Sequence, residues 1–191
     1  MKHHLIAYKS PVGDITCIFQ GTSLVEVSIA MDTGAVPFHQ SIAGGSGKAV
    51  TATVSSGWAH LARELDAYFK GELKEFTQNI KFTRGTCYER KIWRTLKEIP
   101  YGEVRTYKWI ASRIGNPQAT RAVGQALKRN PLPIILPCHR VISSDGTLGG
   151  FSCGVLIKKW LLRHEFGIEG RVCALRETQS KIGRGNEDPS F

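Results

Sequence analysis

The sequence lacks any long uncharged apolar run, and its cysteines are few and irregularly spaced. The longest hydrophobic stretch, 131–138, is interrupted by three prolines, and a membrane span needs roughly 18 apolar residues. The five cysteines show no paired spacing, so they indicate neither a disulfide framework nor a CxxC metal pair. The first nine residues have too short an apolar centre for a signal peptide. These absences predict a soluble protein of a reducing compartment, with no membrane partner.

Acidic side chains are also scarce relative to basic ones, and the imbalance is confined to one part of the chain. The 191 residues include 26 Lys and Arg but only 16 Asp and Glu. Residues 1–86 hold 8 basic and 7 acidic side chains, whereas residues 87–191 hold 18 and 9. This excess predicts a polyanionic partner, because Lys and Arg release condensed counterions when they neutralise phosphates. The alternative is that the basic residues only keep the protein surface soluble, and the charge by itself does not decide between the two.

The first half of the chain has strand-like alternation followed by a helical period. The ranges 4–8, 14–19 and 24–29 alternate in polarity and are separated by turn-forming Pro and Gly residues, which predicts a small antiparallel sheet. Large apolar residues then recur every three to four positions from Trp58, which predicts a helix that ends at Gly71.

The second half contains several short helices with clear start and stop signals. Thr86 and Glu89 fit a capping box, so a helix is expected to begin there. Thr106 is expected to cap the helix 107–114. Asn116 is expected to cap a further helix that begins at Pro117 and runs to Arg129. Two short helices joined across a glycine resemble a helix-turn-helix. A last helix is expected over 155–166.

One apolar segment carries three reactive or charged groups in succession. Within 134–142, which reads as a strand, Cys138 is followed directly by His139 and Arg140. A basic surround and an adjacent imidazole favour the thiolate, which is the nucleophilic form of cysteine. The alternative is that Cys138 is an inert, buried cysteine, as most free cysteines are.

A carboxylate on the last helix is a candidate partner for this segment. Ile157, Leu161 and Glu165 follow one another at intervals of four residues, so Glu165 lies on the apolar face of this helix. It is also near the carboxyl end of the helix, where the helix dipole disfavours an anion. His139 is the simplest partner. Glu165 would then orient His139, and His139 would act as the base for the nucleophile Cys138. The alternative is that Glu165 reaches solvent at a frayed helix end.

These motifs together resemble a known family. The segment Pro137-Cys138-His139-Arg140-Val141, with Arg121-Ala122-Val123-Gly124 before it and Gly149-Gly150-Phe151-Ser152 after it, is similar to the O6-alkylguanine-DNA alkyltransferases. The resemblance covers about residues 80–167. It implies an α+β protein with an RNase H-like amino-terminal domain over 1–85 and a winged-helix-like helix-turn-helix domain over 86–168. Residues 169–191 extend beyond the resemblance, and we expect them to form a flexible tail.

The resemblance also implies a DNA repair reaction that consumes the protein. Cys138 would take the alkyl group from O6-alkylguanine, with O4-alkylthymine as a second candidate substrate, and would keep it as a thioether. His139 would remove the thiol proton through a bound water, Glu165 would orient His139, and Tyr107 would donate to the departing guanine. No cofactor is required. The expected location is the cytoplasm of a prokaryote or the nucleus of a eukaryote.

The partner that the resemblance implies is double-stranded DNA, bound in its minor groove by a monomer. The target base must be extruded from the stack, and Arg121 would fill the space that it leaves. Asn130 would brace the active-site turn, and Val141, Phe151 and Ser152 would line the guanine pocket. The remaining candidate DNA contacts are Tyr88, Lys108, Asn116, Ala119, Ala122, Gly124, Lys128 and Arg129.

The chain departs from the family pattern at the pocket. Phe151 replaces the commoner tyrosine, and Cys153 stands where glycine is more common. The amino-terminal region has no four-ligand spacing, so we expect no zinc there. The chief alternative function is a non-catalytic protein that recognises alkylated DNA, against which Cys138 argues. A zinc site of Cys138, His139, Cys153 and His164 lacks paired spacing, and in a cysteine hydrolase the Cys and His are usually separated in sequence.

Overall fold

The computed structural model describes residues 3–30 and 56–166, which fold as an α+β protein. The chain forms two compact units. The first unit contains residues 1–84 and 131–135, and the second contains 85–130 and 136–191. The expected flexible tail, 169–191, lies outside the described residues. Within the described ranges, no helix is long and apolar enough to cross a membrane.

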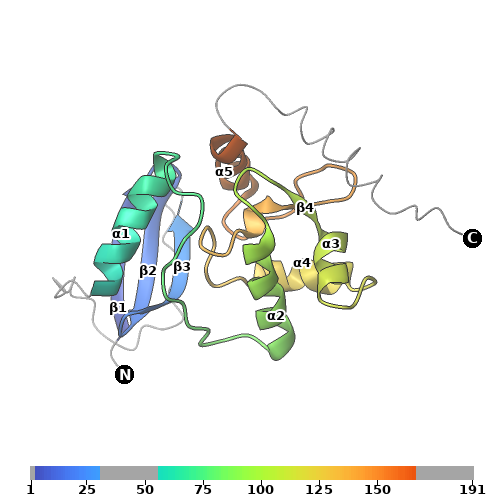
Figure 1. Cartoon of the computed structure of the whole chain (residues 1–191), viewed down its shortest axis with the longest axis horizontal. Coiled ribbons are helices and arrows are strands. Elements are labelled where there is room, and N and C mark those ends of the chain that lie inside the picture. The colour runs from blue at the N-terminus through green and yellow to red at the C-terminus, as the bar shows by residue number, and fades with distance from the viewer. Residues whose placement is uncertain (1–2, 31–55, 167–191) are drawn as a thin grey trace, which may run out of the picture. The chain divides into compact units, whose positions relative to one another are not determined.

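The first unit contains an antiparallel sheet and a helix that packs on it (Figure 1). Its strands are β1 (His3–Ser10), β2 (Gly13–Gln20) and β3 (Ser23–Ala30), with β2 in the middle. Side chains alternate between the two faces of a strand, so Ile15, Cys17 and Phe19 of β2 all point into the core and are fully buried. The helix is α1 (Ser56–Phe69), which buries Leu61, Leu65 and Tyr68. The predicted sheet and helix are therefore confirmed.

The second unit begins with the predicted capping box. Helix α2 (Cys87–Thr95) has Thr86 at its N-cap, and the Thr86 hydroxyl and the Glu89 carboxylate satisfy each other's backbone amides. The 3-10 helix η1 (Leu96–Glu98) follows. The Trp93 indole N–H donates to the Ala126 carbonyl at 2.8 Å and so ties α2 to the helix that carries Ala126.

The two helices that resemble a helix-turn-helix are α3 (Tyr107–Arg113) and α4 (Thr120–Lys128) (Figure 1). Thr106 caps α3 as expected, because its hydroxyl accepts from the Trp109 amide at 3.1 Å. The prediction that α4 begins at Pro117 with Asn116 as its cap is wrong. The Ala119 amide donates to the Asn116 carbonyl at 3.0 Å, which closes a separate turn, and the helix starts at Thr120.

The segment predicted as a strand over 134–142 is mostly not extended. Pro137 removes a backbone donor there, and Ile134 has a φ of 72°, a left-handed conformation that strains a β-branched residue. The chain then forms the 3-10 helix η2 (Cys138–Arg140). Only β5 (Val141–Ile142) is a strand, and it pairs in parallel with β4 (Arg105–Thr106). The last helix, α5 (Val155–Phe166), has the predicted bounds.

Candidate active site

Cys138 is the first residue of η2, and its thiol is held by an asparagine. The Asn130 side-chain amide donates to the Cys138 sulfur at 3.0 Å and to the Leu136 carbonyl at 2.9 Å. The Cys138 amide donates to the same carbonyl at 2.7 Å. Asn130 therefore braces the turn that presents the sulfur, which is the placement that the resemblance implied for it.

The Cys138 thiol is protonated in the resting protein. Only 4% of the residue is exposed, and burial raises the pKa of the thiol to about 12, although the hydrogen bond from Asn130 acts in the opposite direction. The thiolate is the nucleophile, so the thiol must lose its proton as it reacts. A nearby base is therefore required.

His139 and Glu165 form a fully buried pair beside this thiol. The His139 Nε2 lies 2.8 Å from the Glu165 Oε1, and both side chains are 0% exposed. Burial lowers the pKa of His139, so the imidazole is neutral and its Nε2–H donates to the carboxylate. The Nδ1 lone pair has no hydrogen-bond partner in the described part of the chain. The pair thus fixes the tautomer in which Nδ1 is the basic nitrogen.

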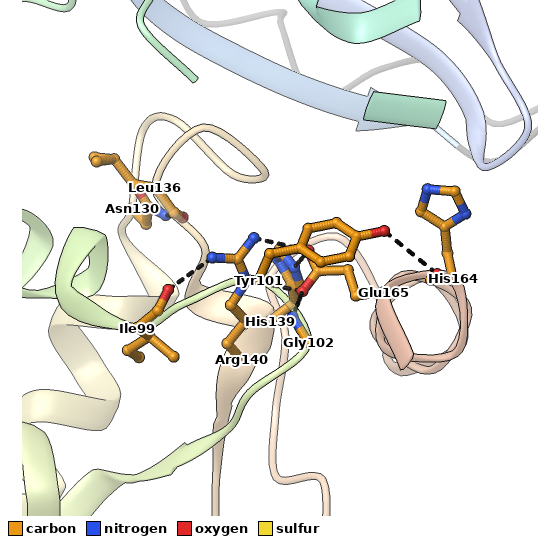
Figure 2. A network of polar contacts seen from close by, with 9 residues as sticks. All are labelled: Ile99, Tyr101, Gly102, Asn130, Leu136, His139, Arg140, His164 and Glu165. Atoms are coloured by element: carbon orange, nitrogen blue, oxygen red, sulfur yellow. Dashed lines mark hydrogen bonds and ion pairs between the residues drawn. The ribbon is translucent and has the colours of Figure 1, made fainter. Parts of the chain in front are cut away.

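Arg140 completes a polar network around Glu165 (Figure 2). Its Nε donates to Oε2 at 2.8 Å and its Nη2 to Oε1 at 3.0 Å, while Nη1 donates to the Ile99 carbonyl at 2.7 Å. Burial acts to raise the pKa of Glu165, but the hydrogen bonds from His139 and Arg140 and the charge of Arg140 hold it well below the usual value. The carboxylate is therefore ionised and held in place by a guanidinium that is always charged.

A pocket of about 380 Å³ opens beside Cys138. Its other lining residues are Tyr107, Gly124, Leu127, Lys128, Gly150, Phe151 and Ser152. The structure therefore brings five predicted site residues other than Cys138 to one cavity: Tyr107, Gly124, Lys128, Phe151 and Ser152. Val141 is fully buried in β5 and does not line the cavity.

Tyr107 is the first residue of α3 and keeps its hydroxyl proton. Burial raises the pKa of the phenol, and the nearby Cys138 thiol acts in the same direction. A Cβ at Gly149, which has a φ of 65°, would lie 2.7 Å from the Tyr107 hydroxyl. The absence of a side chain at Gly149 therefore leaves space for a phenol O–H that can act as a donor in the pocket.

The other predicted contacts lie outside the pocket. Arg121 and Ala122 are exposed in the first turns of α4, and Ala119 is half-buried just before them. Tyr88, Lys108 and Asn116 are also exposed. Arg129 is exposed but its guanidinium is 3.0 Å from the Glu89 carboxylate. These residues form candidate surface contacts for a large partner.

Two residues of the site were missed by sequence reasoning. Arg140 was noted, but no role was predicted for it. Lys158 of α5 was not singled out, yet it is 0% exposed, and its ammonium donates to the carbonyls of Val141 and Leu148. The signal was present in the sequence, because Lys158 lies seven residues before Glu165 and therefore on the same helix face.

The chain is similar to known proteins over its second half. The family model described as the DNA-binding domain of 6-O-methylguanine DNA methyltransferase matches residues 87–167. A methylated-DNA–protein-cysteine methyltransferase of Methanosarcina acetivorans is 54% identical over 104 residues, which are 54% of this chain and 66% of that relative. The chain thus matches just under two thirds of that relative's length.

Solved structures match over more of the chain. The crystal structure of Mycobacterium tuberculosis O6-methylguanine methyltransferase has a TM-score of 0.73 and 34% identity, and covers 92% of this chain and 99% of its own. A structure of Mycobacterium tuberculosis OGT in complex with DNA has a TM-score of 0.70 and 35% identity, and covers 89% of this chain and 97% of its own.

Proposed function

The chain belongs to the methylated-DNA–protein-cysteine methyltransferase family, and we propose that it repairs DNA by moving an alkyl group from O6-alkylguanine to Cys138. The observation that carries this proposal is the arrangement of one buried thiol, a neutral histidine oriented by an ionised carboxylate, and a pocket that reaches the sulfur. O4-alkylthymine is a second candidate substrate at the same site.

The site residues account for each bond and proton in the reaction. The Cys138 sulfur attacks the alkyl carbon, a C–S bond forms, and the bond between that carbon and guanine O6 breaks with its electrons going to guanine. His139 Nδ1 accepts the thiol proton through a water molecule, and Glu165 stabilises the imidazolium that results. The Tyr107 hydroxyl gives its proton to the departing guanine and regains one from solvent, while the His139 imidazolium returns its proton to solvent. The thioether product is a poor leaving group, so each molecule reacts once and no cofactor takes part.

Access to the pocket requires the base to leave the DNA stack. We propose that α4 enters the minor groove with Arg121 filling the space of the extruded nucleotide. Arg121 is exposed in the first turn of α4, and the neighbouring Ala122 and Gly124 are small enough for close approach to a DNA backbone. The remaining surface candidates, Tyr88, Lys108, Asn116, Lys128 and Arg129, would contact the DNA nearby.

We also propose a domain architecture, an oligomeric state and a cellular location for this protein. The matched family model over 87–167 supports a DNA-binding domain at 86–168 of the helix-turn-helix, winged-helix-like kind. An amino-terminal domain over 1–85 would be RNase H-like, and 169–191 would lie beyond both domains. The protein would act as a monomer, in the cytoplasm of a prokaryote or the nucleus of a eukaryote.

The test is a single-turnover reaction with an oligonucleotide that carries O6-methylguanine. We expect one methyl group on the peptide that contains Cys138, in an amount equal to that of the protein. Cys138→Ala should bind the same DNA without transfer. Continued turnover would instead identify a hydrolase, and lesion binding by the native chain without any adduct would identify a non-catalytic recognition protein.

A further inference from the structure

A buried lysine joins the strand that follows the nucleophile to a loop that lines the pocket. The Lys158 ammonium donates to the Val141 carbonyl at 2.6 Å, to the Leu148 carbonyl, and to the Gly150 carbonyl at 3.5 Å. Val141 belongs to β5, which directly follows η2, whereas Leu148 and Gly150 belong to the loop that leads to Phe151 and Ser152. The ammonium thus ties β5 to a loop that lines the pocket at Gly150.

The charge of this ammonium has no counter-ion in the described ranges. Lys158 is fully buried, and no carboxylate forms an ion pair with it among the described residues. A buried cation that is not neutralised is costly, so its retention needs an explanation. Carbonyl oxygens satisfy its hydrogen bonds but leave its net charge uncompensated.

Two residues of η2, Cys138 and His139, interact electrostatically with Lys158. The Lys158 ammonium acts to lower the pKa of the Cys138 thiol and also that of His139. Burial lowers the pKa of Lys158 itself to about 8, while Cys138 acts to raise it. Cys153, in the loop before α5, acts on Cys138 in the opposite sense. The group that must become an anion during transfer is therefore coupled to a buried cation.

We propose that Lys158 is a positioning residue for alkyl transfer, which holds the loop of Leu148 and Gly150 against β5 and supplies the positive charge that stabilises the Cys138 thiolate. This inference rests on the proposed function. A fixed charge in a water-poor site stabilises a developing anion without the reorganisation that solvent would need. The ammonium thus combines two roles that a neutral donor could not.

The proposal predicts a specific pH dependence for transfer. The reacting state has a thiolate at Cys138 and protons on both His139 and Lys158, so it holds as many protons as the resting state with a neutral His139. The rate should therefore be level with pH until Lys158 loses its proton. Above pH 8, close to the lowered pKa of Lys158, the rate should fall.

The experiment compares Lys158→Met with Lys159→Met, because Lys159 is the exposed neighbour and carries the same charge. Single-turnover transfer from an O6-methylguanine oligonucleotide is measured from pH 6 to 9.5. In a second assay, iodoacetamide labels each protein at pH 7 and the Cys138 peptide is quantified by mass spectrometry. Lys158→Met should slow both reactions by about tenfold or more, since a neighbouring opposite charge shifts a pKa by about one unit or more. Its transfer rate should also lack the fall above pH 8.

Lys159→Met should behave as the native chain in both assays. Unchanged rates in Lys158→Met would overturn the proposal, and so would slower DNA transfer with normal iodoacetamide labelling, because the charge would then play no part. If Lys158→Met does not fold, the native pH profile decides, since a rate that stays level to pH 9.5 contradicts the proposed role. Absence of transfer by the native chain would instead reject the proposed function itself.

Discussion

Replacing Glu165 by glutamine should destabilise the protein far more than its change in size suggests. The carboxylate is 0% exposed and accepts hydrogen bonds from His139 and, twice, from Arg140. An amide of the same shape removes the negative charge and leaves the buried guanidinium without an anion. Breaking a buried ion pair by removing one partner costs about 3–5 kcal/mol, so we expect a loss of that size in the free energy of unfolding.

Glu98→Gln is the matched control, because the same substitution there removes an exposed ion pair. Glu98 pairs with Arg113, and their side chains are 42% and 55% exposed. Such surface pairs contribute about 0–1 kcal/mol. Urea unfolding can be followed by tryptophan fluorescence, since three of the four tryptophans (Trp93, Trp109 and Trp160) lie in the second unit. Equal losses in the two variants would refute the reasoning.

The ionisation of Glu165 should also make the free energy of unfolding depend on pH in acid. Although burial would raise the pKa of Glu165, His139 and Arg140 hold it below its ordinary value of 4.5. The folded state therefore binds the proton less readily than the unfolded state does, and the contribution to stability is complete above about pH 4.5 and declines as the pH falls below it. Glu98→Gln should lose more stability between pH 5 and pH 3 than Glu165→Gln. Parallel losses would show that Glu165 does not titrate in this way.

Two further substitutions test the turn and the pocket. Gly149→Ala should slow transfer by tenfold or more, because the new Cβ would lie 2.7 Å from the Tyr107 hydroxyl. Gly71→Ala is the control, since Gly71 has a similar left-handed φ but open space around it. This variant should react normally in the same assay. Asn130→Ala should slow iodoacetamide labelling of Cys138, since the thiol loses a hydrogen bond that lowers its pKa. It should cost about 0.5–1.5 kcal/mol in urea unfolding, because one hydrogen bond to the Leu136 carbonyl is lost while that from the Cys138 amide remains. Unaltered labelling would contradict the role given to Asn130.

Local signals in the sequence were sufficient to predict the structure where a residue type has one common structural role. The capping box at Thr86 and Glu89 and the cap at Thr106 were predicted correctly, because a hydroxyl before an apolar period has few other roles. The pairing of Glu165 with His139 was also predicted. A carboxylate on an apolar helix face needs a buried partner, and His139 was the simplest candidate in the sequence.

The sequence was insufficient where the outcome depended on distant contacts. The start of α4 was misplaced because the Asn116 turn closes on its own backbone, and a Pro after an Asn is compatible with either structure. The segment around Ile134 is as apolar as a strand, but its prolines and left-handed residue bend it. Lys158 was missed because a lysine is normally exposed, and only the folded loop supplies its carbonyl partners.

The pentapeptide 131–135 folds with the first unit although the residues on both sides of it fold with the second. The polypeptide consequently passes from one unit to the other three times rather than once. Leu132, Ile134 and Ile135 are all buried, so a fragment that begins at Gly85 would carry an apolar loop with no core to enter. An evolutionary exchange of the amino-terminal module would therefore succeed only if the incoming module accommodated these five residues.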